Sequence, residues 1–101
     1  MNLLFILYTG VNSHNTASLI GLARSARARG SQVTIFAMSS GVGNLARKDF
    51  TSLAADGVVI TVCEHNRAEN KAPEGIEGVK YGSQYDLAGY IVDSDRVVSF
   101  T

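Results

Sequence analysis

The chain has 101 residues, 46% of them hydrophobic and 18% charged, which predicts a single domain, residues 1–101, with a buried core. Nine Lys and Arg residues balance nine Asp and Glu residues, which argues against a broad basic surface for nucleic acid or an anionic membrane. The first apolar run, Met1 to Tyr8, is too short for a signal peptide or a membrane span. We therefore expect a cytoplasmic protein with no nucleic-acid or membrane partner.

Predicted strands and helices alternate along the first two thirds of the chain. Continuous apolar runs predict strands that are covered on both faces, at Leu3–Tyr8, Gln32–Met38 and Val58–Val62. Between them, apolar residues at helical spacing and suitable start and stop signals predict helices at Asn15–Arg29 and Asn44–Ala55. Strand, helix and strand in succession are typical of parallel sheets.

The last third continues the alternation more weakly. Glu64–Glu69 is expected to form one helical turn before a polar loop, Val79–Ser83 a short strand, Gln84–Val92 a helix and Arg96–Phe100 a last strand. The whole pattern predicts an α/β fold with three layers, α/β/α, around an open and mainly parallel sheet of four to five strands.

Polar and small residues follow the predicted strands, where open parallel sheets form their binding sites, near the point at which strand order switches. Cys63, the only cysteine, ends the third strand in the stretch "VCEHNR". The candidate supporting residues lie after the other strands or just beyond this cysteine: Gly10, His14, Ser39, Gly41, His65, Arg67 and Ser83. We expect Cys63 to lie within reach of the helical turn that follows it and of groups from the Gly10–His14 loop.

Cys63 has two interpretations. If the turn that follows is helical, its unpaired N–H groups favour a thiolate, and His65 and Arg67 add positive character, whereas Glu64 opposes it. A working thiol is expected to be at least partly accessible. Alternatively, a lone cysteine is often an inert buried residue, and His14 and His65 are then solvated loop residues. One cysteine forms no internal disulfide, and with two histidines it provides too few ligands for a structural metal site, so no metal is expected.

Two further sequence motifs bear on the function. Gly41 to Ala46 matches G-x-G-x-x-A, with Glu64 at about the spacing of a ribose ligand in dinucleotide-binding proteins. However, two serines separate the strand from the first glycine, and the chain is too short for two mononucleotide-binding halves. Cysteine-phosphatase chemistry requires an arginine six positions after the cysteine, where this chain has Glu69.

Several stretches together resemble the DsrE/DsrF-like family: "AMSSGVGNLAR" after the second strand, "VCEHN" at the end of the third, and "GVKYGSQYDLAGYIVDSDRVVSF" near the end of the chain. The family includes sulfur-relay proteins such as TusD, in which a cysteine at this strand end accepts sulfur as a persulfide. The resemblance implies this role for Cys63, no cofactor, sulfur donor and acceptor proteins as partners, and a homo-oligomer, namely a dimer, trimer or hexamer. Some relatives have a second cysteine where this chain has Asn66.

The sequence thus supports a sulfur carrier or sulfurtransferase-like protein that uses Cys63 as the acceptor. The alternatives are a non-catalytic module that binds a small molecule or nucleotide in the same crevice, and a structural subunit of an oligomer.

Overall fold

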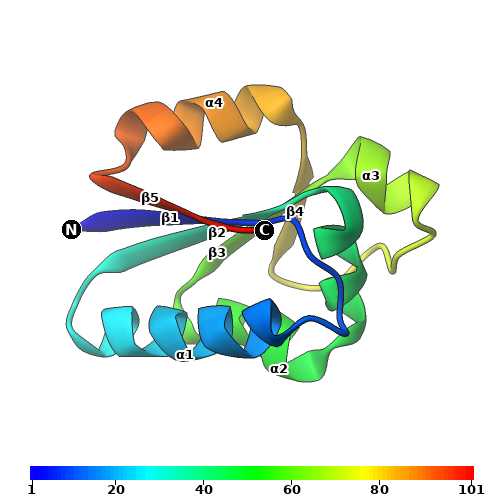
Figure 1. Cartoon of the computed structure of the whole chain (residues 1–101). Coiled ribbons are helices and arrows are strands. Elements are labelled where there is room, and N and C mark those ends of the chain that lie inside the picture. Colours follow the sequence, from blue (N-terminus) through cyan, green and yellow to red (C-terminus); the bar gives the residue numbers. More distant parts are fainter.

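A computed structural model describes all 101 residues and contains one five-stranded sheet in the order β4-β3-β2-β1-β5 (Figure 1). All neighbouring strands are parallel. The strands are β1 (Asn2–Leu7), β2 (Gln32–Ala37), β3 (Val59–Cys63), β4 (Val79–Gly82) and β5 (Arg96–Phe100). The predicted α/β fold is confirmed, and every predicted strand lies within one residue of its expected bounds.

Helices cover both faces of the sheet unequally (Figure 1). They are α1 (His14–Ala28), the 3-10 helix η1 (Ser39–Ala46), α2 (Lys48–Thr51), the 3-10 helix η2 (Ser52–Asp56), α3 (Glu64–Glu69) and α4 (Gln84–Asp93). The helices between β1 and β3 lie on one face, α4 lies alone on the other, and α3 lies beside the sheet at the carboxyl ends of its strands. We call the two faces the α1 face and the α4 face.

The prediction of one continuous helix at Asn44–Ala55 is wrong, because this segment forms parts of three shorter helices, η1, α2 and η2. The fully buried Asn44 side chain donates to Gly41 O and to Thr9 O, at 2.9 Å in both cases, and accepts from Thr16 Oγ1 at 2.7 Å. These bonds tie η1 to the end of β1. Arg47 then has extended backbone angles, φ −95° and ψ 122°, which interrupt the helix. Local helical spacing does not reveal this tertiary anchor.

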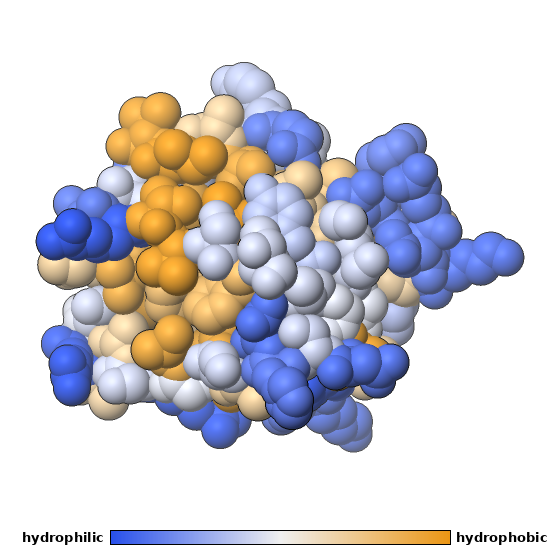
Figure 2. All heavy atoms as spheres, viewed as in Figure 1, coloured by the Kyte–Doolittle hydropathy of each residue, from blue (hydrophilic) through white to orange (hydrophobic).

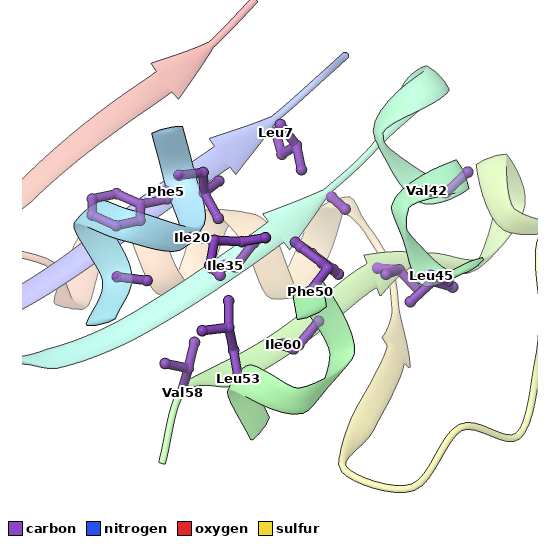
Figure 3. Close-up of a cluster of buried hydrophobic side chains, with 14 of the residues drawn as sticks. Phe5, Leu7, Ile20, Ile35, Val42, Leu45, Phe50, Leu53, Val58 and Ile60 are labelled. Carbon is purple, nitrogen blue, oxygen red and sulfur yellow. The ribbon is translucent and has the colours of Figure 1, made fainter. Parts of the chain in front are cut away.

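Alternation along the strands divides the core in two, because successive side chains point to opposite faces of a sheet. Sixteen buried residues pack on the α1 face, and Figure 3 shows ten of them labelled, among them Phe50, Ile35 and Ile60. Only five pack on the α4 face: Leu4, Ile6, Phe36, Cys63 and Leu87. The α4 face therefore has the smaller core. None of the helices is long and apolar enough to cross a lipid bilayer.

Candidate functional site

Cys63 ends β3 and is also the residue that precedes the first turn of α3. Its Cα is paired in the sheet with Gly82, at the end of β4. The thiol belongs to the α4-face core, where it clusters with Phe36 and Leu87, and the residue is 5% exposed. The expectation of a partly accessible cysteine is therefore wrong in degree, because α4 and the end of β2 cover most of it.

A hollow of about 620 Å³ opens beside Cys63 at the carboxyl end of the sheet. Three strand ends contribute to it, and its lining residues are Met38, Cys63, Glu64, His65, Asn66, Gly82, Ser83, Gln84 and Tyr85. Gln84 Nε2 donates to Met38 Sδ at 3.9 Å, which joins the first turn of α4 to the end of β2. Cys63 thus borders a shallow site whose lining residues are mostly polar in type but expose mainly apolar atoms to the hollow.

Arg67 does not face this hollow. Its guanidinium binds both oxygens of Glu64 at 2.8 Å, donates to Ala72 O at 3.1 Å and lies 3.6 Å from a Glu74 oxygen. The hydrogen bonds between the two side chains lower the pKa of Glu64 and raise the pKa of Arg67. Arg67 therefore offsets the negative charge of the carboxylate beside Cys63 and anchors the loop after α3.

Asn66 and Asn70 attach α3 to the loop after β2. Ser39 N donates to Asn66 Oδ1 at 2.8 Å, and Asn70 Nδ2 donates to Ser39 O at 3.5 Å. Ser39 has a φ of 54°, in the left-handed region that non-glycine residues rarely adopt. These contacts stabilise an unfavourable backbone conformation and set the position of Met38, which lines the hollow.

His65 and Ser83 are the predicted supporting residues that lie with Cys63 around the hollow. The His65 side chain is largely exposed, with Nε2 3.5 Å from Glu69 Oε2. Ser83 is the N-cap residue of α4. Its Oγ accepts a hydrogen bond from Tyr85 N, and the Asp86 carboxylate accepts one from Ser83 N, which together form a capping box.

The other predicted residues do not line the hollow: Gly10, His14, Ser39, Gly41 and Arg67. Gly10 and His14 follow β1, and strand order switches between β1 and β5, two strands away from β3. The carboxyl edge was correctly predicted as the common location of these loops, but Cys63 is not at the switch point.

The two glycines of the G-x-G-x-x-A match have different surroundings. A Cβ at Gly41 would lie 2.1 Å from Leu7 O, so this glycine is required by close contact with β1. A Cβ at Gly43 would meet no atom within 4 Å. Both lie in a 3-10 helix, whereas the dinucleotide fingerprint opens an α-helix. The structure therefore gives Gly41 a packing role that needs no ligand.

Six lining residues are not among the candidates predicted from the sequence: Met38, Glu64, Asn66, Gly82, Gln84 and Tyr85. Each stands at a strand end or in the first turn after one, so the strand-end rule that selected Ser39 and Ser83 could have included them. No group of three or more His, Cys, Asp or Glu side chains that could hold a metal ion occurs in the structure.

Solved structures share this fold. The crystal structure of the YchN protein from E. coli superposes with a TM-score of 0.82 at 21% identity and covers 99% of this chain and 100% of its own. The structure of the conserved protein of unknown function BT1422 from Bacteroides thetaiotaomicron has a TM-score of 0.75 at 17% identity and covers 97% and 94%. No protein-family model and no curated protein sequence matches the chain. The chain therefore shares the fold of these two proteins.

Proposed function

We propose that this chain is a small cytoplasmic sulfur carrier of the relay type and that Cys63 is its sulfur acceptor. The observation that carries the proposal is the position of Cys63, which ends a parallel strand and borders a hollow at the carboxyl end of the sheet. The resemblance of "VCEHN" and of the C-terminal stretch to DsrE/DsrF-like sulfur-relay proteins supports the same role.

The proposed step needs no metal or cofactor. The Cys63 thiolate attacks the outer sulfur of a donor persulfide, a new S–S bond forms at Cys63, and the S–S bond of the donor breaks. The donor leaves as a thiolate, and the thiol proton of Cys63 passes to solvent or to a nearby base. His65, which lines the same hollow, is the candidate for this base.

Low exposure of Cys63 makes access part of the mechanism. The donor sulfur has to enter through the hollow, where Met38 and Gln84 are in contact. Partial burial also protects a bound persulfide from random thiols, because exchange depends on access. Donor and acceptor proteins are the proposed partners, since a hollow this shallow encloses little of a free substrate.

Intact-mass measurement after incubation with glutathione persulfide tests the proposal. We expect the wild type to gain one sulfur atom and Cys63→Ser to gain none. Gln84→Ala, which removes the contact with Met38, should load faster than wild type. An unloaded wild type, with Cys63 alkylated normally after unfolding in denaturant, would show that the cysteine is structural.

The nucleotide-binding alternative predicts a different pattern. There, Gly43 would be required for close approach of a pyrophosphate, so Gly43→Ala would abolish calorimetric binding of NAD or FAD. In the relay proposal, Gly43→Ala retains sulfur loading, because a methyl group at this position meets open space. Saturable dinucleotide binding by the wild type, lost in Gly43→Ala, would favour the alternative.

A further inference from the structure

Strand β5 forms an unusually apolar edge of the sheet. Its first four residues are exposed, including Val97 at 44% and Val98 at 41%, which point to opposite faces. Figure 2 shows that apolar side chains gather around this edge, from α4 across β5 to α1. We define the β5-edge surface as the large exposed aliphatic residues of these three elements: Leu22, Ile91, Val92, Val97 and Val98.

The opposite edge of the sheet, at β4, is covered by the chain itself. Lys80 is paired with Asp86 at 3.2 Å. The Tyr81 hydroxyl donates to Pro73 O and accepts from Ile76 N, both at 3.2 Å, so the segment before β4 folds back against it. Charge and a covering loop are two ways in which proteins protect a strand edge from pairing. The edge at β5 has neither along Val97 and Val98.

The backbone of β5 is also arranged for pairing. Tyr8 N donates to Phe100 O at 3.0 Å, so Phe100 directs its backbone groups toward β1. Because these directions alternate along a strand, Val98 also faces β1, whereas the N–H and C=O groups of Val97 and Ser99 point outward. The outward backbone groups of Val97 and Ser99, with Val98 between them, can form hydrogen bonds with a second antiparallel strand.

We propose that the β5-edge surface binds a second copy of this chain, with the two β5 strands antiparallel about a two-fold axis at Val98. In this register Val97 of one copy lies opposite Ser99 of the other, and each pair can exchange both backbone hydrogen bonds. The result is a continuous ten-stranded sheet. Val98 meets its own counterpart on the α1 face, and Leu22 on α1 flanks this contact. This interface is separate from the Cys63 hollow.

The charges near β5 favour a second copy as the occupant. Asp93, Asp95 and Arg96 all lie at the amino end of the strand, and the carboxyl end around Ser99 is uncharged. An antiparallel arrangement places the charged side chains of each copy opposite uncharged side chains of the other, so no like-charged side chains meet. The net charge of zero also means that two copies do not repel each other. The surface extends over both helix layers, and stable interfaces typically bury about 800 Å² per partner.

A charge-swap experiment tests the two-fold axis, because only a two-fold axis at Val98 places residue 98 of one copy opposite residue 98 of the other. Sedimentation equilibrium of the wild type should give twice the 10.8 kDa monomer mass, or a higher even multiple. Val98→Lys and Val98→Glu alone should each halve that mass, since like charges directly opposite each other destabilise strand pairing. An equimolar mixture of the two variants should restore the wild-type mass.

Val59→Lys is the matched control, because Val59 is also an exposed strand valine, at 47%, but lies on β3 outside the β5-edge surface. It should leave the mass unchanged, and circular dichroism should show that all variants are folded. A monomeric wild type, a trimer, an equal effect of Val59→Lys, or no recovery in the mixture would each overturn the proposal. Cys63→Ser should retain the mass of the wild type, so this result is independent of sulfur loading.

Discussion

The two faces of the sheet differ in how completely one chain covers them. The α1 face buries sixteen clustered residues under α1 and the helices between β2 and β3, whereas the α4 face has one helix and five clustered residues. Cys63 is part of the core of the thinner face, whereas the β5-edge surface is exposed on both faces, with Val97 on the α4 face and Val98 on the α1 face. The comparison indicates that the α1 face provides most of the stability, which allows the α4 face to carry a cysteine and open surface.

The largest expected effect compares one leucine from each face. Leu19 on α1 is 0% exposed and Leu87 on α4 is 8% exposed. Removal of a buried leucine side chain costs about 2–5 kcal/mol, depending on the cavity that remains. We expect Leu19→Ala to lie near the upper end of this range and Leu87→Ala near the lower end, because fewer neighbours surround Leu87. Urea unfolding measures both, and an equal or larger loss for Leu87→Ala would contradict the comparison.

A smaller effect is expected from the polar contact within the α4 face. Thr61 is fully buried, and its Oγ1 lies 2.7 Å from the Tyr90 hydroxyl. Tyr90→Phe should lower the free energy of unfolding by about 1–3 kcal/mol, because the Thr61 hydroxyl loses its partner without access to water. Tyr85→Phe is the control, since Tyr85 is on the same helix but 86% exposed. Equal stability of the two variants would show that water replaces the lost contact.

The smallest effect concerns the start of α4 and depends on pH. Hydrogen bonds from Ser83 N and from Lys80 hold the pKa of Asp86 below its ordinary value of 3.8. A lowered folded-state pKa means that Asp86 stabilises the protein above pH 3.8 and loses this contribution as the pH falls through the folded pKa. Wild type should therefore be more stable than Asp86→Asn at pH 6, and the difference should shrink below pH 3.8.

Asp93→Asn, at the other end of α4, serves as the control. Its stability should follow that of the wild type as the pH is lowered, because Asp93 makes no side-chain contact that caps the helix. A difference between wild type and Asp86→Asn that stays constant from pH 6 to below pH 3.8 would show that the capping bonds do not depend on the charge of Asp86.

Local patterns in the sequence determined the order of strands and helices and the location of Cys63 at a strand end. Apolar runs such as Leu3–Tyr8 predict buried strands because both faces of a parallel sheet exclude water, and β1 (Asn2–Leu7) agrees with that prediction within one residue. The carboxyl edge of the sheet followed from the same alternation.

Only the tertiary structure decided which of these strand-end residues meet. The Arg67 side chain bonds to Glu64 and Ala72, and His14 and Gly10 follow β1. The Asn44 side chain bonds to Thr9 O, and the segment around it forms a 3-10 helix where an α-helix was predicted. The order of strands in space and the burial of Cys63 under α4 likewise depend on contacts between segments distant in sequence. Local periodicity does not encode such contacts, because it records which face of an element is apolar and not which element covers it.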